Sequence, residues 1–324
     1  MSKPTLTDIA RRAGVGTATV ERVLNGRSAV RPATAAKVIA AARALDYPKR
    51  LPEVHRGLLR IEVILVQPET AFFRRLSTAF ERINATLDPS VSFQRTFMDQ
   101  VDPQAIAAHI GATAPPRAGL ILAVPDHPLI RRPLAGVAAW GIPIVHVVTR
   151  VGDRVGDLVS IDNYAAGRTA GLFLSQMQER RGTAIALCHP IYPIHRERTR
   201  GFSDFIAEEP REGLAFRWIG FGRDDPRLCC DLLIDALESW PDLVGLYNAG
   251  AGNGALADVL RRHPRGRDVF FIGHELTDRT AAALRERVMA VVLDQAPEAQ
   301  ARRAADLLLQ RLGLLDMPPD TAPI

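Results

Sequence analysis

The segment "TLTDIARRAGVGTATVERVLNGR", residues 5–27, sets the organisation of the chain. Its apolar residues recur at helical spacing in two short runs, which are separated by a glycine-containing turn. The pattern predicts a first helix capped by Thr7 and ended by Gly14, and a second helix capped by Thr17. A third periodic run, "ATAAKVIAAARALDY", begins at Pro32, and proline is favoured in a first helical turn. Two short helices joined by a tight turn and braced by a third are typical of a helix-turn-helix unit.

Positive charge is concentrated in this head. The first sixty residues contain 12 Lys and Arg against 4 Asp and Glu, whereas the remainder contains 29 basic and 32 acidic residues. The net charge of +5 therefore comes from a cationic head on a mildly anionic body. Such a head favours a polyanionic partner such as DNA. The alternatives are a solvated basic tail, which its regular apolar spacing disfavours, and an ordinary three-helix bundle, which its charge disfavours.

The second predicted helix is narrow enough to enter a DNA major groove. Residues outside its apolar stripe would then meet base edges, and these are Thr17, Ala18 and Arg22. An arginine can donate two hydrogen bonds to a guanine edge, and an alanine methyl can contact a thymine methyl. The pattern therefore indicates a base-reading role for these three positions.

About 43 residues from Thr5 to Tyr47 resemble the N-terminal domain of the lactose/galactose repressor family of bacterial transcriptional regulators. The frame T-x-x-D-I-A-x-x-A-G-V-x-x-x-T-V-x-R-V-L-N is matched almost throughout. The resemblance implies that Thr17, Ala18 and Arg22 read bases. It also implies phosphate contacts by Thr5, Thr19, Asn25 and Val30.

Two features depart from that family. Glu21 stands where the family usually has a serine facing phosphate, so it would need a pairing with Arg22 or Arg27. The segment "YPKRLPEVHRGLLR", residues 47–60, also differs from the family's hinge helix. We expect a linker there that touches DNA mainly through Lys49, Arg50 and Arg56, and a hinge helix on DNA is left open.

Beyond residue 60, short apolar runs alternate with helix-length segments. They include "RIEVILVQ", "AGLILAVP", "IPIVHVV", "DLVSIDN", "GTAIALCHP", "LAFRWIGF", "LVGLYNAG", "DVFFIGHE" and "VMAVVLDQ". This alternation predicts an α/β body with doubly wound parallel sheets, in which ten strands form two lobes of about five each. We expect a helix-turn-helix domain at 1–46, a linker at 47–60, a ligand-binding domain at 61–313 and a loose tail at 314–324.

Polar and aromatic side chains follow the predicted strands. Open parallel sheets bind ligands beyond the carboxyl ends of their strands. Candidates there are Glu69, Phe72, Phe73, Asp126, Asp162, Arg198, Asn248, Glu275 and Gln295. Carboxylates, amides, an arginine and aromatic rings suit a polyhydroxylated ligand such as a sugar or polyol. Asp162 equally suits a helix N-cap, and His189 is better suited to a structural role.

The body also resembles the regulatory domain of the same family, which is similar to a periplasmic sugar-binding protein. "RERTRGF" matches the family's R-x-x-G-F and maps its ligand-binding arginine to Arg198. Asn248, Glu275 and Gln295 match other pocket positions of the family, and Phe221 lies where an aromatic ring often stacks on ligand. His274-Glu275 replaces the family's usual Tyr-Asp, which leaves the identity of the ligand open.

These features together predict a ligand-responsive transcriptional repressor, not an enzyme, that binds a palindromic DNA operator as a homodimer; a tetramer is possible. An enzyme on a doubly wound fold is the first alternative, but "GAGNG" lacks dinucleotide-binding spacing. A solute-binding transport protein is the second, but we find no secretory signal. Three cysteines and no ligand spacing indicate neither disulfides nor metal, and we expect no cofactor. No apolar run suits a membrane span, so we expect a cytoplasmic location.

Overall fold

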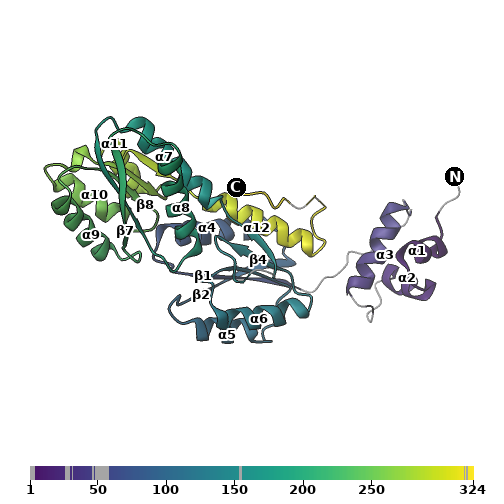
Figure 1. Cartoon of the computed structure of the whole chain (residues 1–324). Helices are drawn as coiled ribbons and strands as arrows, with labels where there is room; N and C mark the ends of the chain where they lie inside the picture. Colours follow the sequence, from purple (N-terminus) through teal and green to yellow (C-terminus); the bar gives the residue numbers. More distant parts are fainter. Residues whose placement is uncertain are drawn as a thin grey trace. The chain divides into compact units, whose positions relative to one another are not determined.

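The computed structural model describes residues 4–25, 30, 32–45, 47, 58–152, 155–316, 318 and 320–324. The chain divides into two compact units, Met1–Leu59 and Arg60–Ile324 (Figure 1). Within the described residues, no helix is both long and apolar enough to cross a membrane.

The first unit is a three-helix head. Its helices are α1 (Leu6–Ala13), α2 (Thr17–Leu24) and α3 (Pro32–Ala44). Ile9, Val20, Val38 and Ala42 lie in its interior and are fully buried. These residues come from all three helices, so the apolar spacing predicted from sequence produces one small core.

The helix ends of the head differ in part from the prediction. The N-cap of α1 is Thr5, whose hydroxyl accepts the Asp8 backbone N–H at 3.3 Å, while the Asp8 carboxylate accepts the Thr5 backbone N–H at 2.9 Å. The prediction of Thr7 as the cap is wrong. A capping box needs a side-chain acceptor three residues after the cap, and Asp8 provides it for Thr5, whereas Ala10 cannot provide it for Thr7. Gly16 rather than Thr17 is the N-cap of α2. Gly14, at φ 66°, ends α1 as predicted.

The second unit contains two five-stranded sheets. In the first lobe the strands are β1 (Leu59–Val66), β2 (Val91–Met98), β3 (Gly119–Ala123), β4 (Ile144–Val147) and β5 (Asp157–Val159). In the second lobe they are β6 (Gly182–Cys188), β7 (Leu214–Phe221), β8 (Leu243–Asn248), β9 (Phe270–His274) and β10 (Val291–Leu293). The orders are β2-β1-β3-β4-β5 and β7-β6-β8-β9-β10, which are the same order twice. The two-lobed prediction is confirmed.

Helices flank both sheets, as Figure 1 shows. Those of the first lobe are α4 (Ala71–Asn84), α5 (Pro103–Gly111) and α6 (Pro128–Ala139). Those that follow are α7 (Asn163–Met177), α8 (Pro193–Glu208), α9 (Pro226–Ser239), α10 (Asn253–Arg262), the short 3-10 helix η1 (Gly266–Asp268), α11 (Asp278–Arg285) and α12 (Pro297–Arg311). Strand β2 is missing from the runs named above because only two residues of this edge strand are buried and its other residues are half-buried or exposed, which is a weaker signal than a continuous apolar run.

The chain passes between the lobes twice within the described residues. Residues 160–163 join β5 to α7, and residues 294–297 join β10 to α12, which packs against α4 of the first lobe. The tail was expected to be loose, whereas its described residues bind the body. Arg303 pairs with the Asp320 carboxylate at 2.7 Å, and the Ile324 N–H donates to the Ser160 carbonyl at 3.0 Å. These contacts hold the end of the chain beside the first crossing.

Candidate functional site

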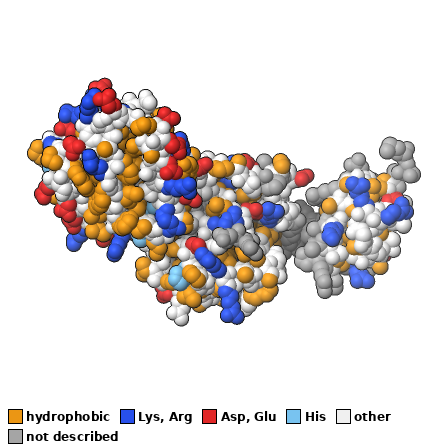
Figure 2. Space-filling model, viewed as in Figure 1, with side chains coloured by type: hydrophobic (Ala, Val, Ile, Leu, Met, Phe, Trp, Pro, Cys, Tyr) orange, Lys and Arg blue, Asp and Glu red, His pale blue; other side chains and the backbone are white. Residues whose placement is uncertain are grey.

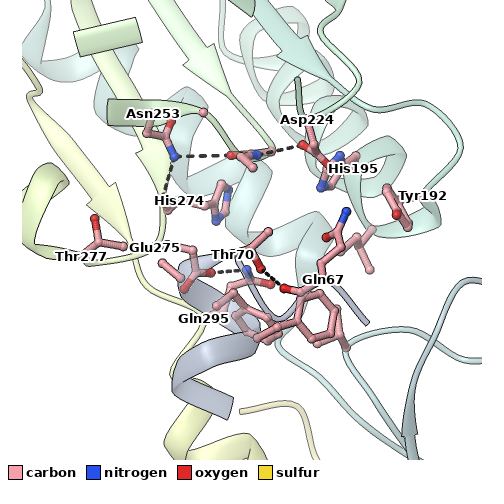
Figure 3. A pocket seen from close by; sticks show the side chains of 18 of the residues that line it. Gln67, Thr70, Tyr192, His195, Asp224, Asn253, His274, Glu275, Thr277 and Gln295 are labelled. Atoms are coloured by element: carbon pink, nitrogen blue, oxygen red, sulfur yellow. Dashed lines mark hydrogen bonds between the residues drawn. The ribbon is translucent and has the colours of Figure 1, made fainter. Parts of the chain in front are cut away.

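A cavity of about 560 Å³ lies between the two lobes of the second unit. Its lining comes from the loops after β1, β3 and β4 in the first lobe and after β6 to β10 in the second. The carboxyl ends of parallel strands are where doubly wound sheets bind ligands. Figure 3 shows polar side chains from several of these loops pointing into the same space.

Arg198, on α8, lines this cavity and is only 1% exposed. Its Nε donates to Oδ1 of Asn163 at 2.8 Å, and its Nη1 donates to the Ala249 carbonyl at 2.8 Å. Its Nη2 donates to the side-chain oxygen of Gln295. A buried guanidinium needs such acceptors because burial without partners is costly. Asn163 and Gln295 belong to the two crossings, so Arg198 connects both passages of the chain between the lobes.

Two glycines bring α8 close enough for these contacts. A Cβ at Gly167 of α7 would lie 2.0 Å from the Arg198 carbonyl oxygen, and a Cβ at Gly201 of α8 would lie 2.1 Å from the Tyr164 carbonyl oxygen. A larger residue at either position would separate the two helix backbones. The close packing of α7 against α8 therefore fixes Arg198 beside the start of α7.

Glu275, directly after β9, is the second charged group of the cavity. Its Oε1 accepts a hydrogen bond from the Gln295 amide, and its Oε2 lies 3.6 Å from Nη1 of Arg75. Burial is the main cause that raises the pKa of Glu275 to about 7. The carboxyl group can therefore donate or accept a hydrogen bond near neutral pH.

Asp224 supplies a further carboxylate from the loop after β7. Its Oδ1 accepts the Ala251 N–H at 2.8 Å, and burial raises its pKa. A Cβ at Gly250 would lie 2.2 Å from this oxygen, so the loop after β8 approaches Asp224 as closely as glycine allows. Asn248 holds that loop by donating to the carbonyls of Gly250 and Ala251.

The cavity also gathers strained backbone. Four lining residues other than glycine have positive φ: Gln67 at 47°, Val148 at 72°, Asp224 at 58° and Glu275 at 69°. Each follows a strand end, and the left-handed region is especially unfavourable for a β-branched residue such as Val148. Strain of this kind clusters at ligand-binding sites, because it places side chains where regular backbone would not.

The head offers an exposed face on α2. Thr17, Ala18, Arg22 and Asn25 are exposed, while Thr19 is half-buried. Thr5 is also exposed, but its side chain is engaged in capping α1. Val30 packs in part against the core of the head. Lys49, Arg50 and Arg56 lie outside the described residues. Figure 2 shows Lys and Arg side chains on the visible face of this unit. Arg11, Arg12 and Lys37 are also exposed in the head.

Comparison with known proteins assigns both units. Residues 5–49 match the model of the bacterial regulatory proteins of the lacI family, and residues 61–313 match a periplasmic binding protein domain. The head is therefore a lacI-family domain, and the body belongs to the periplasmic binding protein domain family. This confirms the resemblance stated from the sequence, with a periplasmic-binding-protein-like body behind the helix-turn-helix head.

Individual relatives agree with this assignment. The chain is 29% identical over 226 residues to an uncharacterized HTH-type transcriptional regulator in the aml 5′ region of Streptomyces limosus, covering 63% of this chain and 58% of the relative. The match therefore spans little more than half of the relative's length.

Solved structures share the fold of the body. A periplasmic solute binding protein of Actinobacillus succinogenes with bound D-allose is 15% identical, covers 81% of this chain and 94% of its own, and has a TM-score of 0.72. AraP, an arabinose binding protein from Geobacillus stearothermophilus, is 19% identical, with coverages of 82% and 91% and a TM-score of 0.68. At these identities the likeness concerns the fold.

The structure of the body separates the predicted ligand residues into two groups. Those that line the cavity are Glu69, Phe72, Phe73, Arg198, Glu275 and Gln295. Their roles toward a ligand stay predictions.

Four other predicted residues do not line the cavity. Asp126 instead pairs with Arg131 at 2.7 Å, and Asp162 caps α7 by accepting the Ala165 N–H at 2.8 Å. Phe221 is 54% exposed at the end of β7, and Asn248 is buried behind the loop that it holds. Local hydrogen bonds hold the side chains of Asp126, Asp162 and Asn248 away from the cleft, and Phe221 is exposed to solvent instead of lining the cleft.

Sequence reasoning missed several residues of the site. Tyr192, His195, Asp224 and Asn253 line the cavity but were not proposed. Asp224 could have been found, because it follows β7 by three residues and obeys the same strand-end rule as the others. His195 and Asn253 lie in helices, and no spacing in the sequence signals their orientation. No cluster of His, Cys, Asp and Glu suited to a metal occurs among the described residues.

Proposed function

We propose that this protein is a ligand-responsive, DNA-binding repressor of transcription. It binds a palindromic operator as a homodimer through its head, and it senses a sugar or polyol in the cavity between its lobes. The family of the head and the regulator from Streptomyces limosus support the DNA-binding part. The body's likeness to a solute binding protein with bound D-allose and to an arabinose binding protein supports the choice of ligand.

The observation that carries the proposal is the hydrogen bonding of Arg198 to both crossings, through Asn163 and Gln295. A ligand that bonds to Arg198 or Gln295 acts on the segments about which the lobes can rotate. It therefore favours one lobe orientation if its contacts differ between orientations. Coupling of this kind typically changes affinity at a second site by about 5–150-fold.

The test is operator binding by the full chain with and without ligand. An operator is first selected from a random duplex library, and its affinity is then measured by fluorescence anisotropy in the presence of individual sugars and polyols. We expect at least one of them to change the operator affinity by about fivefold or more. Absence of any selected duplex at low salt would contradict the proposal.

Arg22→Ala tests the base-reading face of α2. Arg22 is exposed on α2, so we expect the variant to fold normally. It should lose about 1–3 kcal/mol of discrimination between operator and random DNA, because bidentate base contacts have this value. Arg12→Ala, on the exposed face of α1, is the matched control and should weaken binding to both duplexes alike. Unchanged discrimination in a competition assay would refute the role of Arg22.

A further inference from the structure

The first lobe contributes an apolar wall to the cavity. Phe72 and Phe73 follow β1, Val124 and Pro125 follow β3, and Val148 follows β4. Strands β1, β3 and β4 are neighbours in the sheet, so these five residues line the same side of the cavity. The two phenylalanine rings pack edge to face, with their centroids 5.3 Å apart.

Few polar groups of this wall are available to a ligand. The Thr70 hydroxyl donates to the Gln67 carbonyl at 3.1 Å, and the Glu69 side chain is exposed at the margin. Asp126, the carboxylate that follows β3, is bound to Arg131 and to the Gly152 N–H. The Gln67 amide and the Thr149 hydroxyl remain inside the cavity and both are neutral, so the Glu69 carboxylate at the margin is the charged group of this wall.

The second lobe contributes the opposite kind of wall. The Arg198 guanidinium has five N–H donors. Three of them form hydrogen bonds within the protein, so two remain for a ligand. Oε2 of Glu275 is buried and makes no hydrogen bond in the part of the chain that the structure describes. Asp224 and Gln295 add an acceptor and an amide beside them, and Figure 3 shows both of these residues with Glu275 around the cavity.

We infer that the effector is amphipathic: a sugar carrying an apolar aglycone, such as an aryl glycoside. The sugar hydroxyls bond to Arg198, Asp224 and Glu275, and the aglycone packs against Phe73 and Val148. This inference rests on the proposed function and specifies its ligand. A cavity of about 560 Å³ falls within the range of about 300–1,000 Å³ that holds drug-sized ligands, which leaves room for more than a sugar ring.

Matched glycosides test the inference. Isothermal titration calorimetry on the full chain compares the methyl and phenyl glycosides of glucose, galactose and arabinose in both anomeric forms. We expect that for one of these sugars the phenyl glycoside binds at least about tenfold more tightly than the methyl glycoside, because burial of an aromatic ring on an apolar wall is favourable.

Two variants test whether the aglycone contacts the apolar wall. Val148→Thr keeps the shape of the side chain but adds a hydroxyl to the wall, and Phe73→Leu keeps an apolar side chain but removes the ring. Each should reduce the phenyl preference to less than about threefold, because it weakens binding of the phenyl glycoside more than binding of the methyl glycoside. Val101→Thr, at a position 77% exposed and outside the cavity, is the control and should preserve the preference.

The possible results distinguish a failure of the amphipathic-effector inference from a failure of the proposed ligand-sensing function. Equal affinities for methyl and phenyl glycosides, with a ligand effect on operator binding, would overturn the inference and leave the proposed function in place. A phenyl preference that survives both wall variants would also overturn it. If no glycoside or free sugar binds and operator affinity never changes, the ligand-sensing function fails together with the inference.

Discussion

The two lobes of the body share one strand order but present opposite walls to the same cavity. In the first lobe, Phe73, Pro125 and Val148 follow the strands, whereas in the second lobe Arg198, Asp224 and Glu275 do so. The repeated topology fixes where a ligand contacts each sheet. The residues that line the cavity after each strand decide the chemistry of the contact, so we expect the first lobe to select apolar groups and the second to select hydroxyl groups.

The walls also differ in their connection to the rest of the body. The apolar wall makes no directional bond to the crossings within the described residues, whereas Arg198 and Gln295 bond across them. We therefore expect changes in the first wall to alter ligand preference, and changes in the second wall to alter both ligand binding and the response to it.

Replacement of Arg198 should have the largest effect. Arg198→Ala leaves Asn163, Gln295 and the Ala249 carbonyl without their donor, and a buried group left unsatisfied costs about 1–3 kcal/mol. We expect the free energy of unfolding to fall by about 3 kcal/mol and ligand affinity to fall at least about 100-fold. Denaturant unfolding and calorimetry measure the two effects. Arg200→Ala, exposed on the same helix, is the control. A variant that still responds to ligand at wild-type concentrations would show that Arg198 is not in the binding site.

The titration of Glu275 should produce the next largest effect. Its folded pKa of about 7 lies above the ordinary value of 4.5, so the folded chain retains a proton that the unfolded chain releases between these values. The stabilising contribution is complete below pH 4.5 and is lost as the pH rises through 7. The stability difference between wild type and Glu275→Gln should therefore decrease between pH 5 and pH 8, by an amount on the order of 2–3 kcal/mol. A difference that is independent of pH in urea titrations would contradict the assignment.

Replacement of Arg75 tests the ion pairs that join α4 of the first lobe to the crossing at residues 294–297 and to the start of α12. This residue of α4 pairs with Asp294 at 2.6 Å and with Glu298 at 2.7 Å, and it donates to the Leu276 carbonyl at 3.2 Å. Arg75→Met should reduce the free energy of unfolding by about 1 kcal/mol, since the cluster is partly exposed. Removal of the nearby positive charge should also raise the pKa of Glu275. Arg74→Met, at the exposed neighbouring position, should change neither quantity in thermal unfolding across pH.

Tyr192 should have the smallest effect on stability. Its hydroxyl donates to Gln100 of the other lobe, whereas the hydroxyl of Tyr164 donates to Asp204 within the second lobe at 2.9 Å. Tyr192→Phe and Tyr164→Phe should each cost about 0.5–1.5 kcal/mol or less. Only Tyr192→Phe should alter ligand affinity, because only its bond crosses the cleft. Equal ligand affinities of the two variants would show that the Gln100 contact does not bear on ligand binding.

The order of elements could be predicted because its signals are local. The capped apolar runs of the head and the continuous apolar runs of most strands indicate helices and buried strands directly. The first helix cap was misplaced because Thr5 and Thr7 are chemically equivalent as caps, and only Asp8, three residues after Thr5, distinguishes them.

The site could be predicted only in part. Phe73, Arg198 and Glu275 all follow a strand in the sequence and line the cavity, because all parallel strands end at the same edge. Sequence could not show that Asp126 would pair with Arg131, or that α8 would bring His195 to the cavity. The contrast between the walls also depends on which strands are neighbours, and neighbours are defined by the sheet rather than by chain order.

The most direct test of the two-wall account is a crystal structure of the full chain with the phenyl glycoside that stabilises it most. The account predicts that the sugar hydroxyls bond to Arg198, Asp224 or Glu275 while the phenyl ring contacts Phe73 and Val148. A glycoside bound in the reverse orientation, with its hydroxyls on the first lobe, or bound outside the cavity would contradict it.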